Sequence, residues 1–264
     1  MRLQILSFML ISILGLQAQA LPSPDIVQRI VSQGVPEDAL TRLLDFIYFY
    51  NGRSFYQEIY VCAGAPLGSA KPCEESKRIP SFKFVTLRSP TNVVIINYGA
   101  PSTDYRFFLI NLETGDVTRF YSSHGVGSGK SNFASRFSNI QDSRQTSLGI
   151  FMTGETYVGR YGQTLRMYGL QTSNDQAYKR DIVLHGAWYV GDKFINSIDP
   201  TTGLKYGRLG LSWGCPAVST QYIQSLITTL GSGSLIMHYH NNLMESALTG
   251  GEVIATGTDV IAQE

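Results

Sequence analysis

The chain has 264 residues, of which 43% are hydrophobic and 16% are charged, and its net charge is +1 at pH 7. This balance excludes the strongly basic surface that nucleic-acid binding requires, so we expect no nucleic-acid partner. The length is sufficient for one domain with a sizeable hydrophobic core. The 26 glycines, 15 tyrosines and 13 phenylalanines are typical of a β-rich protein with many turns.

Residues 1–20 are predicted to be a signal peptide. Arg2 supplies a positive charge, residues 5–16 are mostly apolar, and residues 18–20 form a small-x-small cleavage site. We expect cleavage after Ala20 and export to the periplasm or cell wall. The apolar stretch is too short to span a membrane, and no later stretch is long enough, so we expect no stable membrane insertion after cleavage.

Residues 21–80 are expected to form an N-terminal helical segment followed by a loop. Apolar residues recur with a helical period in residues 25–33, before Gly34, and again from Pro36 to Asn51. Proline fits the first turn of a helix, and an Asn-Gly pair is a common helix end. Residues 51–80 are interpreted as irregular and stapled by a disulfide.

The three cysteines fall into a pair and a single residue. Cys62 and Cys73 flank a stretch rich in glycine and proline that can close into a loop. In the oxidising compartment of an exported protein such a pair tends to form a disulfide. Cys215 is then an unpaired thiol, which needs a functional reason in that compartment. No histidine lies near the pair, so we expect no metal site there.

From residue 81 the pattern changes to that of β-strands. The expected strands cover residues 82–87, 92–97, 106–110, 117–121, 147–153, 165–170, 181–184 and 235–239. The glycine-rich stretch 124–130 lacks the spacing of a phosphate-binding loop. Residues 241–264 are polar, contain Gly250-Gly251, and are expected to form a loose C-terminal tail.

Residues 181–218 carry the strongest chemical signal. A buried strand is predicted to end at His185, which Gly186 follows, and Cys215 stands 30 residues later between Gly214 and Pro216. Residues 217–227 show a helical period, so we expect Cys215 to lie just before a helix N-terminus, where the helix dipole favours a thiolate. A thiolate beside an imidazole is a nucleophile and base pair for acyl transfer.

The alternative for this pair is an inert buried cysteine and a hydrogen-bonded core histidine. The neighbouring Gly186, Ser212 and Gly214, taken with the expected helix start, favour the catalytic interpretation. 

Other residues remain open between two roles. Trp213 is either a wall of the site or a core aromatic residue. Arg208 either binds a substrate carboxylate or is solvated, and His124 either lines the cleft or belongs to a turn. Glu155 is a structural or functional carboxylate. His238 and His240 lack a third metal ligand, so we expect no metal centre.

The chain resembles the L,D-transpeptidase (YkuD-type) catalytic domain, and more narrowly its murein L,D-transpeptidase catalytic domain-like branch, over residues 92–240. The matching strings are His185-Gly186, Ser212-x-Gly214-Cys215-Pro216, the 124–129 loop, Ser147-Leu-Gly149-x-Phe151 and Gly154-Glu-Thr-Tyr157. Trp213 stands where the broad family has histidine, no arginine closely follows Cys215, and the gap from His185 to Cys215 is longer. These departures resemble the narrower branch.

The resemblance implies a β-rich α+β fold, a YkuD-like mixed β-sheet catalytic domain with few helices at residues 81–240. It implies peptidoglycan stem peptides as substrate, Cys215 as nucleophile and His185 as base, with no cofactor. We expect the Gly186 carbonyl to orient the imidazole, the N–H groups of Gly214 and Cys215 to bind the oxyanion, and Ser212 to hold the turn or donate to the histidine. The alternatives are an L,D-carboxypeptidase, a cysteine peptidase acting on proteins, and a non-catalytic cell-wall binding module.

Overall fold

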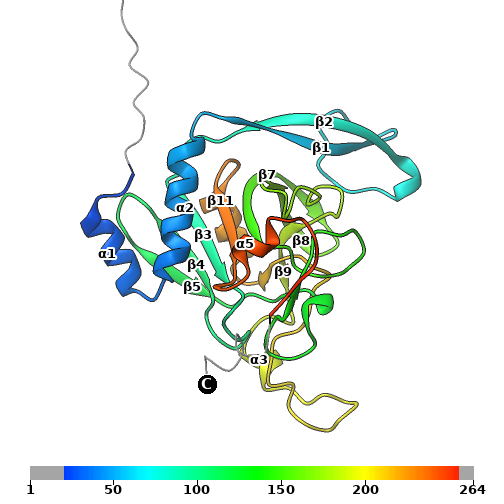
Figure 1. The fold of residues 1–264 in the computed structure, drawn as a ribbon. Helices are drawn as coiled ribbons and strands as arrows, with labels where there is room; N and C mark the ends of the chain where they lie inside the picture. The colour runs from blue at the N-terminus through cyan, green and yellow to red at the C-terminus, as the bar shows by residue number, and fades with distance from the viewer. Residues whose placement is uncertain (1–20, 256–264) are drawn as a thin grey trace, which may run out of the picture.

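A computed structural model of the protein describes residues 21–255 (Figure 1). The predicted signal peptide and residues 256–264 lie outside the described residues. The centre of the fold is an eight-stranded mixed sheet with the order β10-β9-β8-β7-β11-β3-β4-β5. Its strands are β3 (Asn92–Asn97), β4 (Phe107–Asn111), β5 (Val117–Phe120), β7 (Gly149–Gly159), β8 (Gly162–Gly169), β9 (Val183–Ala187), β10 (Ala217–Ser219) and β11 (Leu235–Tyr239).

The sheet curls into a nearly closed barrel. Its two edges approach where Ser123, just after β5, bridges to Ala217 of β10. Strands β3 and β11 pair in parallel at the middle of the sheet, whereas most other neighbours are antiparallel. Residues 93–96 and all of β11 are buried, as expected for central strands covered on both faces. The predicted β-rich mixed fold is therefore confirmed.

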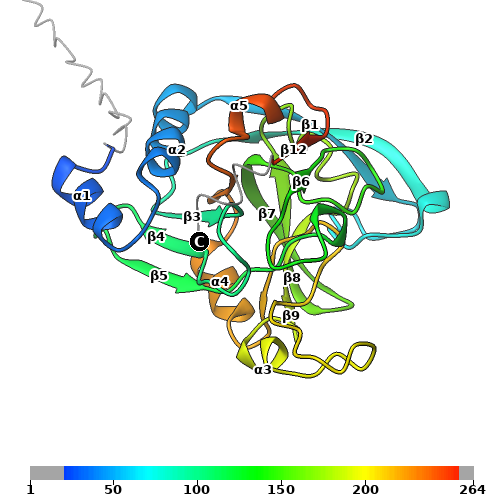
Figure 2. The same ribbon diagram turned by 60° about the horizontal axis from the view of Figure 1, so that its bottom comes forward.

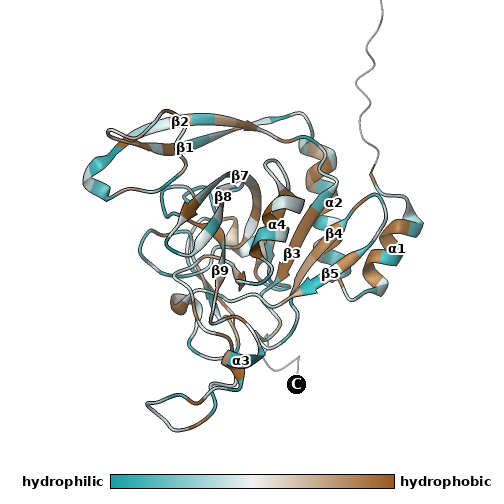
Figure 3. Ribbon diagram, turned by 180° about the vertical axis from the view of Figure 1, so that it is seen from behind, coloured by the Kyte–Doolittle hydropathy of each residue, from teal (hydrophilic) through white to brown (hydrophobic). Residues whose placement is uncertain are grey.

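Helices cover the barrel from outside. The two predicted N-terminal helices are present as α1 (Pro24–Ser32) and α2 (Glu37–Tyr50). Helix α2 runs along the barrel beside β3 and β11 (Figure 1) and buries Leu40, Leu43 and Ile47. Seen from behind, α4 (Ile223–Leu230) lies close to β3 (Figure 3). Short helical turns complete the set: η1 (Glu75–Lys77), η2 (Val126–Ser128), α3 (Asp192–Ile195) and α5 (Met244–Ala247).

The expected irregular loop at 51–80 is largely wrong. Strand β1 (Ser54–Cys62) pairs with β2 (Arg78–Thr86) in an antiparallel hairpin, with Ser54 opposite Thr86 and Cys62 opposite Arg78. Figure 2 shows this hairpin extending over β7 and β8. Because apolar residues occupy both of its faces, β1 shows no clear alternation along the chain. The predicted disulfide between Cys62 and Cys73 is present in the loop that joins the two strands.

The hairpin is attached to the barrel by polar contacts. Gln57 Nε2 donates to the Gly169 carbonyl at 3.0 Å. Lys83 forms an ion pair with Glu155 and donates to the Tyr168 hydroxyl at 3.1 Å. Glu155 therefore has a structural contact, which answers the question that the sequence left open.

The helix predicted directly after Cys215 is wrong at its start. Residues 217–219 form β10, which pairs in parallel with β9, and helix α4 begins only at Ile223. The backbone of β9 supplies hydrogen-bond partners for residues 217–219, and this tertiary pairing overrides the local helical period. Cys215 consequently precedes a strand, and the helix start expected beside its thiol is not there.

The expected loose tail is also wrong for residues 241–255. Strand β12 (Val253–Ile254) pairs with β6 (Arg136–Phe137), and α5 precedes it. Several apolar residues within this polar stretch are buried: Leu243, Met244, Ala247 and Val253. Among residues 21–255, no helix has the length and apolar character needed to cross a membrane.

Candidate active site

Cys215 and His185 line one cavity of about 560 Å³ beside β9. This strand continues to Ala187, so His185 lies at its centre and not at its end as predicted. The cavity walls are formed by the turn between β7 and β8, the segment before β9, and residues 211–215, which we call the cysteine loop. The lining residues are Lys71, Pro72, Asp142, Tyr157, Gly159, Arg160, Tyr161, Thr164, Arg180, Asp181, Val183, His185, Tyr189, Leu211, Ser212, Trp213 and Cys215. The two residues singled out from the sequence therefore share one cavity.

The sheet and its neighbours fix the His185 ring. The His185 backbone N–H donates to the Pro216 carbonyl at 3.4 Å, which ties β9 to the cysteine loop. Nδ1 lies 3.0 Å from the Gly186 carbonyl, and because a carbonyl only accepts, Nδ1 carries the proton. Tyr161 stacks on the ring with centroids 4.8 Å apart. Burial lowers the pKa of His185, so the ring is neutral at pH 7 with Nε2 as an acceptor.

The thiol of Cys215 faces a backbone carbonyl. Sγ donates to the Asp181 carbonyl at 3.5 Å and makes no hydrogen bond with His185. Burial raises the pKa of Cys215 to about 11, although a hydrogen bond from the Val183 backbone and the charge of Arg180 oppose this rise. The resting pair is therefore a neutral thiol and a neutral imidazole, not the thiolate that the expected helix dipole would favour.

The loop before Cys215 is held by its own hydrogen bonds. Ser212 Oγ donates to the Cys215 carbonyl at 2.6 Å and accepts from the Gly214 N–H at 3.2 Å. Gly214 has φ +113°, and a Cβ there would lie 2.7 Å from the Gln145 carbonyl oxygen, so a side chain is excluded. Of the two roles considered for Ser212, these contacts fit the one of holding the turn.

The glycine-rich loop lies behind the cysteine loop. The Ser212 N–H donates to the His124 carbonyl at 3.0 Å, and the Val126 N–H donates to the Ser212 carbonyl at 2.8 Å. The His124 ring is fully buried: Arg106 donates to Nδ1 at 2.9 Å, and Nε2 contacts the Gly129 carbonyl at 3.2 Å. Burial, followed by the charge of Arg106, lowers the pKa of His124 to about 3. His124 is not among the residues that line the cavity.

Of the predicted substrate-binding residues Trp213 and Arg208, only the first lines the cavity. Trp213 lines the cavity, is 72% exposed, and has the Arg144 guanidinium 4.6 Å from its ring centroid. Arg208 is not a lining residue and donates to the Leu209 carbonyl at 2.7 Å. His238, which was set aside as a metal ligand, is buried with Nδ1 2.8 Å from the Ser147 carbonyl.

Several lining residues were not identified from the sequence. The cationic side chains in the wall are Lys71, Arg160 and Arg180, and the aromatic ones include Tyr157, Tyr161 and Tyr189. They come from separate segments with no shared motif, so no pattern joins them before folding. The basic residues just before the β9 strand, at 179–180, are the only local signal.

A nearly closed mixed barrel with an unpaired cysteine and a buried histidine in one cavity is the arrangement expected for an L,D-transpeptidase domain. The family model described as the L,D-transpeptidase catalytic domain matches residues 77–239. Because this match covers more than half of the chain, the protein belongs to that family.

Solved structures of the same class also match. One is the L,D-transpeptidase (residues 123–326) from Xylanimonas cellulosilytica DSM 15894, with 17% identity, a TM-score of 0.32, and coverage of 57% of this chain and 61% of that one. Another is the LD transpeptidase LdtMt1 in complex with imipenem, with 12% identity, a TM-score of 0.33, and coverage of 61% and 63%. The chain thus spans less than two thirds of either structure's length. No curated protein matches the chain.

Proposed function

We propose that the protein is a peptidoglycan-modifying L,D-transpeptidase that acts on stem peptides through a Cys215 acyl-enzyme. The observation that carries this proposal is the shared cavity of Cys215 and His185 in a chain of this family. The Cys62–Cys73 disulfide supports an extracytoplasmic location, in the periplasm or cell wall.

The neutral resting pair defines the first step. The thiol hydrogen rotates about the Cβ–Sγ bond from the Asp181 carbonyl toward His185, and Nε2 takes this proton while Sγ attacks the carbonyl carbon between the third residue and the terminal D-amino acid. The C–N bond breaks, and the imidazolium returns the proton to the departing amine. The peptide is then held as a thioester.

The second step releases the acyl group. An amine from a neighbouring stem gives up a proton to His185 and attacks the thioester carbon. A new amide forms, the C–S bond breaks, and the imidazolium returns the proton to Sγ, which regenerates the thiol. Water in the same position would make the protein an L,D-carboxypeptidase.

The oxyanion donors differ in availability. The Gly214 N–H already donates to Ser212 Oγ, and Pro216 has no N–H. We therefore assign the Cys215 N–H as the donor that meets the oxyanion in both steps, with Gly214 providing the close backbone approach.

Mass spectrometry of purified tetrapeptide muropeptides tests the function. We expect the wild-type protein to produce cross-linked dimers or exchanged terminal D-amino acids, and the folded Cys215→Ala variant to produce neither. Tripeptides alone would indicate the carboxypeptidase, and casein cleavage without muropeptide turnover a protein-directed peptidase. Binding of cell-wall sacculi without turnover would indicate the binding module. Equal turnover by wild type and Cys215→Ala contradicts the proposed nucleophile.

A further inference from the structure

Asp181 connects the cysteine to a partly buried charge cluster. Its backbone carbonyl is the acceptor for Cys215 Sγ, at 3.5 Å. Its φ is +54°, a left-handed conformation that is uncommon outside glycine, although aspartate tolerates it better than most residues. The orientation of the carbonyl thus depends on whatever holds this residue in a conformation that is costly for a non-glycine residue.

The Asp181 carboxylate is held by three donors. Arg166 Nη1 lies 2.8 Å from one oxygen, Arg78 Nη2 lies 2.6 Å from the other, and the Tyr60 hydroxyl donates to the first. The Arg166 side chain is fully buried, and its guanidinium lies 4.4 Å from the Tyr178 ring centroid. Charge-assisted hydrogen bonds from a buried arginine fix a carboxylate more firmly than exposed ion pairs do.

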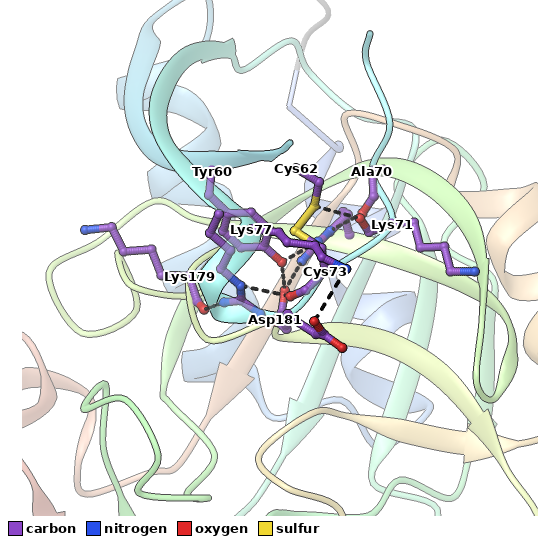
Figure 4. The surroundings of a disulfide bond; sticks show 11 residues. Tyr60, Cys62, Ala70, Lys71, Cys73, Lys77, Lys179 and Asp181 are labelled. Atoms are coloured by element: carbon purple, nitrogen blue, oxygen red, sulfur yellow. Dashed lines mark hydrogen bonds and ion pairs between the residues drawn. A yellow bond between two sulfur atoms is a disulfide. The ribbon is translucent and has the colours of Figure 1, made fainter. Parts of the chain in front are cut away.

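Two of these three donors come from the β1–β2 hairpin. Arg78 also donates through Nε to the Cys73 carbonyl at 3.1 Å and through Nη1 to the Lys179 carbonyl at 3.0 Å. Arg166 Nε donates to the Ala70 carbonyl at 2.8 Å, inside the disulfide-closed loop. Figure 4 shows Tyr60 and the Cys62–Cys73 disulfide beside Asp181, with the dashed contacts meeting at its carboxylate.

We propose that Asp181 is a positioning residue for Cys215. The β1–β2 hairpin then supports the active site, because its residues Tyr60 and Arg78 hold the Asp181 carboxylate. The carboxylate anchors the residue, its left-handed backbone turns the carbonyl toward Sγ, and the carbonyl fixes the position of Sγ while the thiol hydrogen can still rotate toward His185. This inference deepens the proposed function and rests on it for the acyl-transfer step.

Several charged and titratable groups act on the thiol. The Asp181 carboxylate raises the pKa of Cys215, whereas the Arg180 and Arg166 guanidinium groups lower it. The same cavity is also lined by His185, Tyr157 and Tyr189. Negative charge on Cys215 raises the pKa of Tyr157, of Tyr189 and of the buried Tyr98. Loss of the Asp181 charge would lower the pKa of Cys215 in two ways. It removes a nearby negative charge, and it leaves the positive charge of Arg166 without its partner.

The test is the pH profile of Cys215 alkylation by iodoacetamide, followed by intact mass on the folded protein. Asparagine tolerates the left-handed conformation but lacks the charge, so we expect Asp181→Asn to lower the alkylation midpoint by about one pH unit. Alkylation at pH 8 then becomes about tenfold faster. Acyl transfer to muropeptides is expected to fall at least about tenfold, because Sγ is no longer held in place for attack. Opposite changes in the two rates distinguish positioning from a general loss of reactivity.

Two control variants separate this effect from loss of stability. Glu58→Gln removes the exposed ion pair between Lys179 and β1, which joins the same two segments, and should keep the wild-type alkylation profile. Val94→Ala in the core of β3 lowers stability without touching the cavity. An Asp181→Asn profile that matches wild type, or that matches Val94→Ala, overturns the proposal. Alkylation of Cys215 can be measured even if the wild-type protein shows no muropeptide turnover. Absence of turnover in the wild type would therefore contradict the proposed function and leave the alkylation test of Asp181 intact.

Discussion

Two buried histidines adjoin the cysteine loop, but their surroundings prepare them for different roles. The His185 ring lines the cavity and has one fixed partner, the Gly186 carbonyl, which leaves Nε2 free to accept a proton. Both ring nitrogens of His124 are occupied, by Arg106 and the Gly129 carbonyl, and the ring lies outside the cavity lining. A base needs an accessible lone pair, and of these two histidines His185 is the one that has it.

The histidine variants should therefore separate chemistry from stability. We expect His185→Ala to lower the acylation rate by about 10²–10⁴-fold, the usual contribution of a positioned base. His124→Ala should leave the acylation rate of the folded protein within a few-fold, but lower the free energy of unfolding by about 1–3 kcal/mol, because buried Arg106 loses an acceptor. Acylation kinetics and urea unfolding of both variants provide the measurement. Comparable rate losses in the two folded proteins would require the base to be reassigned.

Two loops that are distant in sequence form one element behind the cysteine. The segment 124–126 exchanges backbone hydrogen bonds with Ser212, and a Cβ on Gly125 would lie 2.3 Å from the Arg144 carbonyl oxygen and 2.8 Å from the Gly214 Cα. These contacts are with backbone, so no side-chain rotation relieves them. This close approach requires glycine at position 125.

A methyl group at position 125 should disturb both loops. We expect Gly125→Ala to lower the free energy of unfolding by about 1–3 kcal/mol and to reduce acylation, because the Gly214 backbone is displaced. The matched control is Gly251→Ala, where the nearest atom to a new Cβ is 3.8 Å away and the change should stay within about 0.5 kcal/mol. Urea unfolding and acylation rates compare the two. If Gly125→Ala behaves like Gly251→Ala, the two loops do not depend on each other.

Buried neutral histidines make the stability of the whole molecule sensitive to acid. Burial lowers the pKa of His124 to about 3 and of His238 to about 4, and it also lowers the pKa of His185. In the unfolded chain these rings titrate near the ordinary value of 6.5. Between the two values the unfolded state binds more protons than the folded state, so protons stabilise the unfolded chain.

The free energy of unfolding should consequently fall as the pH decreases from 7 to 5. Each histidine contributes a slope of up to about 1.4 kcal/mol per pH unit below its unfolded pKa. Urea unfolding at pH 7, 6 and 5 measures this slope, and His238→Gln should reduce it by about one proton. A stability that is constant or that rises on acidification over this range would show that these rings are charged in the folded protein.

The sequence by itself determined the parts of the protein that depend on neighbouring residues. Helices α1 and α2 follow from apolar periodicity and end signals, and the buried runs of β3 and β11 follow from continuous apolar residues. The pairing of Cys62 with Cys73 follows from a short turn-rich loop. The strings around His185 and Cys215 are local as well, so the two residues in the shared cavity could be predicted.

Only the tertiary structure decided what depends on distant partners. Residues 217–219 became a strand because β9 supplied backbone hydrogen bonds, and β1 became a strand because β2 pairs with it across the disulfide loop. The pKa of the Cys215 thiol is raised because folding removes part of its surface from water. Asp181 acquired its role because Arg78 and Arg166, more than eighty residues apart, meet at its carboxylate. Pairing, desolvation and charge convergence are properties of the packed chain, and no local sequence pattern encodes them.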